Sequence, residues 1–184
     1  MRVIAGEAKG RRLTGIRRSA IRPTSDRVRE ALFSALGAAV PGADVLDLYA
    51  GSGALGIEAL SRGAASAVFV DSGREAVDAI HANLALTRMD DRATVVRTAV
   101  GGFLATGRHG PFDVVFLDPP YAEGPPLEDL EALVGGGLLG DGAWVVLETR
   151  GPDAPPPVDG LELTSLRRYG DTTLVFLRPP GQEP

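Results

Sequence analysis

Residues 47–56 read DLYAGSGALG and stand between a short apolar run and a helical pattern. The apolar run at 45–48 is typical of a buried strand, and residues 54–61 are typical of a helix. Gly51 and Gly53 allow the tight turn between them, and the free N–H groups at the start of a helix suit a nucleotide ligand. The segment therefore predicts a strand, loop and helix of a doubly wound sheet, with a nucleotide at the loop.

The same alternation of apolar runs and helical stretches continues along the chain. We expect further strands at 67–70, 94–96, 113–117 and 143–147, and helices at 27–36, 74–86 and 127–134. Fully apolar strands that alternate with helices are typical of an α/β fold whose parallel sheet is covered on both faces. Residues 161–168 and 172–178 predict a closing antiparallel pair, because Tyr-Gly-Asp separates them.

Composition excludes several classes of protein. The length of 184 residues suits a single domain. The chain contains no cysteine, which excludes disulfides and thiolate metal sites. The two histidines, His81 and His109, have no metal-ligand spacing, so we expect no metal. No apolar run approaches the ~20 residues of a membrane span, and residues 1–7 lack the apolar core of a signal peptide. We expect a cytoplasmic monomer that does not engage a membrane.

Charge is distributed unevenly along the chain. Residues 1–30 hold nine basic and three acidic side chains, a balance of +6, whereas the whole chain carries −5. A basic arm on an acidic body predicts a polyanionic partner, although a solvated tail would look the same. We divide the chain into a basic N-terminal arm or hairpin at 1–22 and a main domain at 23–184, and expect the sheet to fold without residues 1–20.

Two carboxylates flank the glycine loop. Asp71 ends the second expected strand, twenty residues after Gly51, where an acid accepts hydrogen bonds from ribose hydroxyls. Its alternative role is to cap the helix that begins near Arg74. The loop and Asp71 predict an adenosine site, which NAD and S-adenosylmethionine share. Asp47 favours the second, because it would repel a pyrophosphate but suits the cationic methionine end of S-adenosylmethionine.

Asp118-Pro119-Pro120-Tyr121 follows the fourth strand, beside the first in a doubly wound order. The Asp118 carboxylate and the Pro119 carbonyl can hold both N–H groups of an exocyclic amine and favour a pyramidal nitrogen. Tyr121 offers a ring on which an extruded base can stack. The alternative is a Pro-rich turn in which Asp118 serves the backbone. Behind the glycine loop and Asp71, the motif predicts methyl transfer to a base.

These segments resemble known methyltransferases. Residues 118–121 resemble the D/N-P-P-Y motif of amino-group S-adenosylmethionine methyltransferases, and residues 47–53 resemble their motif I. The N-terminal part of the chain resembles the signature of the RsmD family at RVIAG (2–6), GRRL (10–13) and RPTSDRVREALF (22–33). Members of this family are bacterial 16S rRNA guanine-N2 methyltransferases that act on guanine 966. The resemblance runs from residue 2 to about residue 147. It implies a class I, Rossmann-like sheet of seven strands, with 16S rRNA of the small ribosomal subunit as substrate.

The resemblance also implies three groups of site residues. The catalytic group comprises Asp118, Pro119, Pro120 and Tyr121. The cofactor group comprises Asp47, Tyr49, Ala50, Gly51, Ser52, Gly53, Asp71, Ser72 and Ala99. The RNA group comprises Arg2, Lys9, Arg11, Arg12, Arg17, Arg18, Arg22, Thr24 and Arg27. Many methyltransferases place an acid after the third strand to hold the adenine amine, but residues 97–100 contain none, so the backbone around Ala99 would serve.

Three other functions remain open from the sequence. An adenine-N6 DNA or RNA methyltransferase could use the same Asp-Pro-Pro-Tyr motif. A nicotinamide-dependent oxidoreductase could use the spacing of Gly51, Gly53 and Gly56, but it leaves Asp47 and residues 118–121 unexplained. A non-catalytic RNA-binding module would need the arm alone.

Overall fold

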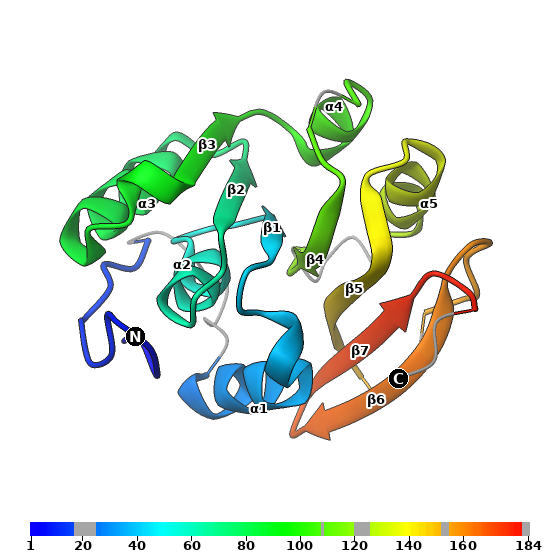
Figure 1. Cartoon of the computed structure of the whole chain (residues 1–184), viewed down its shortest axis with the longest axis horizontal. Coiled ribbons are helices and arrows are strands. Elements are labelled where there is room, and N and C mark those ends of the chain that lie inside the picture. The colour runs from blue at the N-terminus through cyan, green and yellow to red at the C-terminus, as the bar shows by residue number, and fades with distance from the viewer. Residues whose placement is uncertain (17–24, 108, 120–125, 152–154, 182–184) are drawn as a thin grey trace.

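A computed structural model describes residues 1–16, 25–107, 109–119, 126–151 and 155–181 (Figure 1). The elements in chain order are α1 (Asp26–Leu36), the 3-10 turn η1 (Gly37–Ala39), β1 (Asp44–Leu48), α2 (Ala54–Ser61), β2 (Ser66–Asp71), α3 (Arg74–Thr87), the 3-10 turn η2 (Asp90–Arg92), β3 (Ala93–Arg97), α4 (Val100–Leu104), β4 (Phe112–Leu117), α5 (Leu127–Gly135), β5 (Leu139–Arg150), β6 (Glu162–Tyr169) and β7 (Thr172–Arg178).

One seven-stranded sheet organises the molecule, in the order β3-β2-β1-β4-β5-β7-β6. The five strands from β3 to β5 are parallel neighbours, and β7 runs antiparallel to both β5 and β6. The order reverses between β1 and β4, which is the switch point where doubly wound sheets bind ligands. The predicted α/β class, the mostly parallel sheet and the antiparallel closing pair are confirmed.

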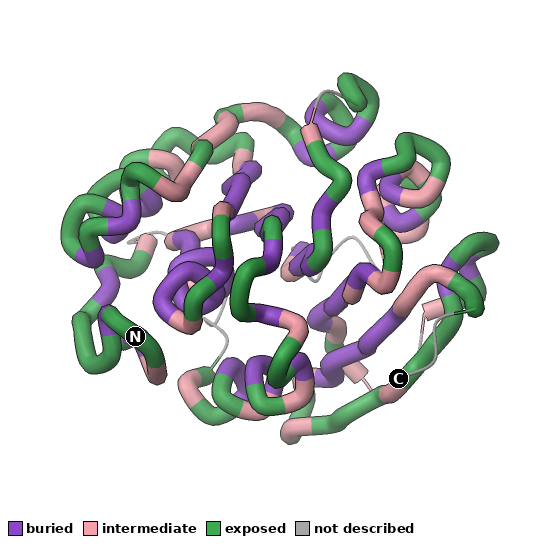
Figure 2. Tube along the Cα trace, viewed as in Figure 1, coloured by how far each residue is buried: buried purple, intermediate pink, exposed green. Residues whose placement is uncertain are grey.

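Helices cover both faces of the sheet, and each face has its own apolar core. Buried side chains of α1, α2 and α3 form one core cluster with one face, and those of α4 and α5 form the other. In β1 the alternation is direct, because Val45 belongs to the first cluster whereas Leu46 and Leu48 belong to the second. Figure 2 shows the buried stretches concentrated on the strands inside the sheet and on the inner sides of the helices, whereas the edge strands β3 and β6 have no buried residue.

One helix and one strand differ clearly from the sequence prediction. The helix α4 was not expected, since Gly101 and Gly102 weaken the helical pattern. It forms because Val100, Phe103 and Leu104 share one face, at spacings of three and four, and are buried against the sheet. The strand β5 extends beyond the expected 143–147 to Leu139–Arg150, because β4 pairs with its beginning and β7 with its end.

The described part of the arm, residues 1–16, folds as a short antiparallel hairpin on α2. Val3 N–H donates to Arg11 O at 2.9 Å, and Leu13 N–H donates to Met1 O at 3.1 Å. Val3, Ala8 and Leu13 are buried in the first core cluster. The expectation that the sheet folds independently of residues 1–20 therefore needs correction, since removing them would expose this core. The proposed boundary after residue 22 lies outside the described residues and stays a prediction.

A buried carboxylate fastens the hairpin to α2. Glu58 is fully buried, and its two oxygens accept hydrogen bonds from Ile4 N–H at 2.7 Å and Ala5 N–H at 3.0 Å. Arg62 Nε donates to the same carboxylate at 2.7 Å. Gly6 approaches the helix so closely that a Cβ there would lie 1.6 Å from Ser61 O. The hairpin is thus an integral part of the folded core.

None of the described helices is both long enough and apolar enough to cross a membrane.

Candidate cofactor and substrate site

The strand register brings the predicted site residues to one edge of the sheet. Leu48 at the end of β1 is paired with Val70 of β2 on one side and with Leu117 of β4 on the other. The next residues along each strand, Tyr49, Asp71 and Asp118, therefore lie at the same carboxyl edge. This edge is where the loops of a parallel α/β sheet bind ligands.

The glycine loop after β1 has a backbone that few residue types adopt. Gly51 and Gly53 have φ values of 56° and 76°, and Tyr49 has a φ of 59° despite its side chain. Such a conformation costs a non-glycine residue roughly 1–3 kcal/mol and is concentrated at functional sites. Tyr49 is held there by its hydroxyl, which donates to Asp129 Oδ2 of α5 at 2.5 Å. The loop is thereby tied to the opposite side of the switch point.

Asp71 connects the loops that follow β1 and β2. Its Oδ2 accepts a hydrogen bond from Gly51 N–H at 2.9 Å, and its Oδ1 accepts one from Gly73 N–H at 2.8 Å. The predicted neighbourhood of Asp71 and Gly51 is therefore present in the structure. The N-cap of α3 is Gly73, so Asp71 supports the start of that helix from two residues further back. Ser72 is exposed beside it.

Asp47 lies deeper than the other predicted cofactor residues. Its side chain is on the α2 side of β1, only 1% exposed, and Oδ2 accepts a hydrogen bond from Gly56 N–H at 2.9 Å. Burial raises the pKa of Asp47 to about 8; the hydrogen bond from Gly56 acts in the opposite direction, and the Asp71 charge adds to the increase. Asp47 thus holds the first turn of α2 against the sheet. A cation at the loop would favour its ionised form.

Gly56 serves helix packing. A Cβ at this position would lie 2.3 Å from Phe69 Cε1, so α2 could not approach β2 with any larger residue there. The G-x-G-x-x-G spacing therefore has a structural cause at its third glycine.

Asp118 directly follows β4 and is half-buried, with Oδ1 shielded from solvent. Pro119 is buried beside it, whereas the predicted residues Pro120 and Tyr121 lie outside the described residues. Ala99 precedes α4 in extended conformation, and the backbone just before it contacts the site, since Thr98 N–H donates to Asp71 O at 3.1 Å. The loops after β1, β2, β3 and β4 thus meet at one edge.

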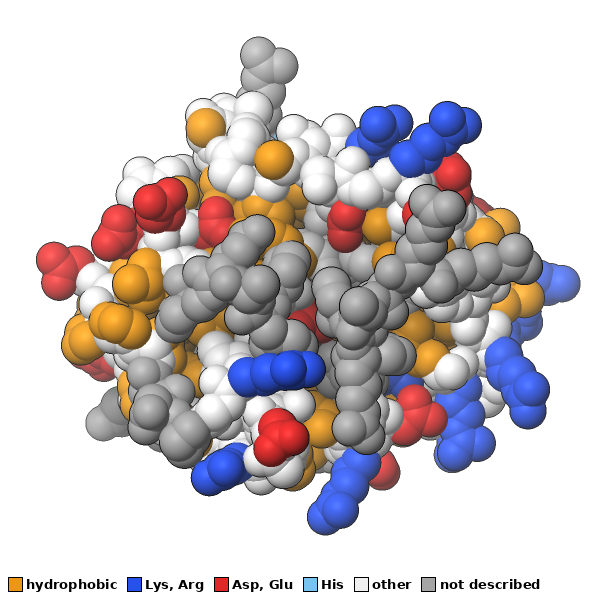
Figure 3. Space-filling view, turned by 180° about the vertical axis from the view of Figure 1, so that it is seen from behind, with side chains coloured by type: hydrophobic (Ala, Val, Ile, Leu, Met, Phe, Trp, Pro, Cys, Tyr) orange, Lys and Arg blue, Asp and Glu red, His pale blue; other side chains and the backbone are white. Residues whose placement is uncertain are grey.

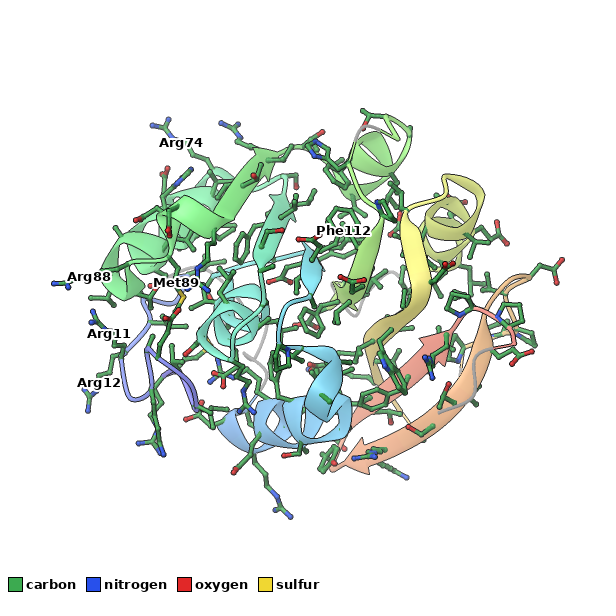
Figure 4. All side chains as sticks on the ribbon, in the orientation of Figure 1. Arg11, Arg12, Arg74, Arg88, Met89 and Phe112 are labelled. Carbon is green, nitrogen blue, oxygen red and sulfur yellow. The ribbon has the colours of Figure 1, made fainter. Side chains whose placement is uncertain are left out.

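The predicted RNA residues fall into two sets. Those in the described part of the chain are all exposed: Arg2, Lys9, Arg11, Arg12 and Arg27. The others, Arg17, Arg18, Arg22 and Thr24, lie outside it. Arg11 and Arg12 extend from the arm at the corner where Arg88 ends α3 (Figure 4), and Arg11 Nη1 donates to Leu86 O of that helix. Figure 3 shows basic side chains gathered along the side of the molecule that the arm and α3 form.

Two residues that the sequence did not indicate contribute to the site. Asp129 holds Tyr49, but no spacing in the sequence marks it. Asn83 carried a detectable signal, because it is a polar residue on the apolar face of α3, one turn from Ala79 and Ile80. It is fully buried and contacts both the arm and the glycine loop. Among the described residues, no group of His, Cys, Asp or Glu could hold a metal ion.

Comparisons with known proteins agree with this geometry. The family model described as Conserved hypothetical protein 95 matches residues 1–178. The Escherichia coli protein named "Ribosomal RNA small subunit methyltransferase D" is 39% identical over 158 residues, which cover 86% of this chain and 79% of the relative. A solved structure of the E. coli protein yhhF superposes with a TM-score of 0.87 at 36% identity and covers 99% of both chains.

A more distant structure shares the fold alone. SMU.776, solved in complex with SAH (S-adenosylhomocysteine), has a TM-score of 0.65 at 17% identity, over 83% of this chain and 48% of that one. The sheet order and the likeness to the yhhF structure identify a Rossmann-like class I methyltransferase fold. The family model spans nearly the whole chain, and the E. coli relative shares 39% of its aligned residues with it. The chain therefore belongs to the RsmD family of rRNA methyltransferases.

Proposed function

We propose that this protein transfers the methyl group of S-adenosylmethionine to the exocyclic N2 amine of a guanine in 16S rRNA. The observation that carries the proposal is the register of the carboxyl edge, which aligns Asp118 with the glycine loop and Asp71 on the neighbouring strands. Family membership argues against the nicotinamide-dependent oxidoreductase and the non-catalytic RNA-binding module. The small-subunit rRNA substrate is supported by the name of the E. coli relative.

The residues present fit S-adenosylmethionine, which when bound supplies an electrophilic methyl group on its sulfonium. Gly51 and Gly53 have left-handed backbone conformations and no side chain, so the backbone of the loop is accessible to a ligand. Asp71 lies beside that turn and has lone pairs left for ribose hydroxyls. The buried Asp47 carboxyl would be stabilised in its charged form by the cationic methionine end. The backbone around Ala99 would face the adenine.

On the substrate side, Asp118 and Pro119 hold the amine. The lone pair of an exocyclic amine is delocalised into the base, so the nitrogen is a poor nucleophile. Two acceptors, the Asp118 carboxylate and the Pro119 carbonyl, would bind its two N–H groups and favour the pyramidal geometry that localises the lone pair. Both residues directly follow Leu117, the last paired residue of β4. Such positioning of two reactants can supply roughly 7–11 kcal/mol of a barrier.

The arm supplies the third part of the proposal. Its exposed arginines would bind rRNA phosphates, and its hairpin presents them from a fixed position on α2 and α3. All residues of the proposed site belong to one chain, so we expect a monomer to be active. Because the substrate is ribosomal RNA, we expect the protein to work in the cytoplasm.

The decisive test identifies the methylated nucleoside. Small-subunit rRNA is incubated with the protein and labelled S-adenosylmethionine, digested to nucleosides, and analysed by mass. We expect the label in N2-methylguanosine. Label in N6-methyladenosine would keep the Asp-Pro-Pro-Tyr chemistry but refute the guanine assignment. Absence of label with wild-type protein, when a known rRNA methyltransferase labels the same RNA, would refute the proposed function.

A further inference from the structure

Asn83 lies at the point where the arm, the glycine loop and α3 meet. It is fully buried, and its amide makes three hydrogen bonds outside its own helix. Asn83 Nδ2 donates to Thr14 O at 3.0 Å and to Ser52 O at 2.9 Å. Asn83 Oδ1 accepts from Thr14 N–H at 2.7 Å. One side chain thus binds two segments that are distant from each other in the sequence.

The geometry suits asparagine and no close substitute. Its amide supplies two donors and one acceptor, and all three are used. An aspartate would lose both donors and place a charge where none of the three partners is cationic. An alanine would remove the partner that the backbone groups of Thr14 and Ser52 share at the buried Asn83 side chain. Asn83 therefore specifies how the arm lies against the loop.

The contact continues from the hydrogen bonds onto the loop itself. Ile16 Cδ1 lies 3.8 Å from the position that a Cβ would occupy on Gly51. The Ile16 side chain thus lies against the turn in which Gly51 N–H is held by Asp71. The same arm carries Arg11 and Arg12, which are exposed to solvent. A displacement of the arm would therefore be transmitted to the cofactor loop through the buried amide of Asn83.

We propose that Asn83 is a positioning residue that couples the basic arm to the cofactor loop, so that RNA on the arm and cofactor at the loop strengthen each other's binding. This inference rests on the proposed function for the identity of the two ligands. RNA bound to the arm would restrict the motion of Thr14 and, through Asn83, that of the Ser52 carbonyl. By thermodynamic linkage, cofactor binding at the loop must favour arm and RNA binding by the same factor.

The test uses the full chain, with S-adenosylhomocysteine as the cofactor probe and 16S rRNA as the RNA probe. Hydrogen exchange is measured at residues 13–16 and at the glycine loop, with and without S-adenosylhomocysteine. We expect the probe to slow exchange at both segments in the wild-type protein. In Asn83→Ala the slowing at the loop should remain and the slowing at residues 13–16 should be lost. The affinity for S-adenosylhomocysteine should fall about tenfold, as for a lost buried hydrogen bond.

A matched control lies one turn away. Thr87 is also buried on α3, but its hydroxyl donates to the carbonyls of Asn83 and Leu84, which belong to its own helix. Thr87→Val should retain the exchange pattern and the wild-type affinity. The dissociation constant for S-adenosylhomocysteine should drop several-fold when rRNA is present in wild-type and Thr87→Val proteins, and by much less in Asn83→Ala.

The outcomes separate the inference from the function it rests on. If wild-type protein binds S-adenosylhomocysteine with slower exchange at the loop but not at residues 13–16, the coupling is refuted and the proposed function stands. That measurement needs no variant, so it decides even if Asn83→Ala does not fold. Equal enhancement by rRNA in wild-type and a folded Asn83→Ala protein also refutes it. No binding of the probe to wild-type protein overturns both claims.

Discussion

Asp71 has a structural role in the folded chain in addition to its proposed contact with the ribose. It accepts hydrogen bonds from Gly51 and Gly73, so it also shapes the loop that would contact the rest of the cofactor. We predict that Asp71→Ala weakens S-adenosylhomocysteine binding by ~1.5–3 kcal/mol, the contribution of hydrogen bonds to a charged group. Calorimetry measures this directly. Asp78→Ala removes an exposed carboxylate of α3 and should bind normally; equal affinity of both variants would remove Asp71 from the site.

Asp47 gives the ligand-free protein a characteristic pH dependence. Its pKa is raised to about 8 in the fold from an ordinary 3.8, so between these values the native state holds a proton that the unfolded chain releases. Its contribution to stability is complete below pH 3.8 and declines as pH rises to 8, by at most about 1.4 kcal/mol per pH unit.

Asp47→Asn removes this titration while the side-chain oxygen can still accept from Gly56. The free energy of unfolding of Asp47→Asn, relative to wild type, should therefore increase between pH 5 and pH 8. Urea titrations across that range measure the difference. A constant difference would show that the Asp47 carboxyl titrates in the fold as it does in the unfolded chain.

At this scale the sequence indicated the residues that lie at strand ends, and missed those that reach the site from helices. Asp71 and Asp118 could be predicted because a parallel sheet brings its carboxyl ends together. Asn83 and Asp129 could not be placed, since their roles depend on how α3 and α5 rotate against the loop. Asp47 was expected in contact with a ligand, and the structure adds its hydrogen bond to α2.

Among the elements, the N-terminal hairpin departs most from its sequence prediction. The arginine-rich run predicted a basic arm or hairpin without which the sheet would fold, but Val3, Ala8 and Leu13 alternate with the charges and enter the core. Glu58 on α2 could not be recognised as their anchor, because its partners are backbone N–H groups more than fifty residues away. The charge pattern predicted the exposed surface of the hairpin. The surface that packs against the core could not be predicted, because it depends on the contacts with α2.

The anchoring of the hairpin can be measured as stability. We predict that Glu58→Ala lowers the free energy of unfolding by roughly 3–5 kcal/mol, because it leaves Arg62 and two backbone donors without a buried partner. Chemical denaturation gives the value. Glu75→Ala, an exposed carboxylate in the first turn of α3, is the control and should change stability little. A small effect at Glu58 would mean that the hairpin is loosely held.

The outer surface of the hairpin predicts a salt-dependent contact. Arg12→Ala should weaken rRNA binding, and the slope of log affinity against log salt should become shallower by about 1, as one phosphate contact is lost. Arg74 is the matched control, because it is exposed at the opposite end of α3 from Arg88 (Figure 4). If Arg12→Ala and Arg74→Ala have the same slope as wild type, Arg12 does not contact RNA.

At the scale of the whole molecule, the doubly wound topology could be predicted from the sequence because the signals for strands, helices and turns are consistent with one another. Apolar strands alternate with helices, glycine follows β1, and Gly170-Asp171 joins the last two strands, all of which agree with the observed strand order. That order places β4 beside β1 and brings Asp118 to the glycine loop. The central proposal is that Asp118 holds the amine to be methylated, and it rests on this arrangement and on family membership.

The most direct test is the single-turnover rate of methyl transfer to small-subunit rRNA by Asp118→Ala, with S-adenosylhomocysteine affinity measured in parallel. We predict a rate roughly 10²–10³-fold below wild type, as for the loss of one preorganised partner of a reacting centre, with nearly normal affinity and fold. Asp118→Asn keeps an acceptor oxygen and should retain more of the rate. Transfer by Asp118→Ala at the wild-type rate would contradict the account, because the amine would then be held elsewhere.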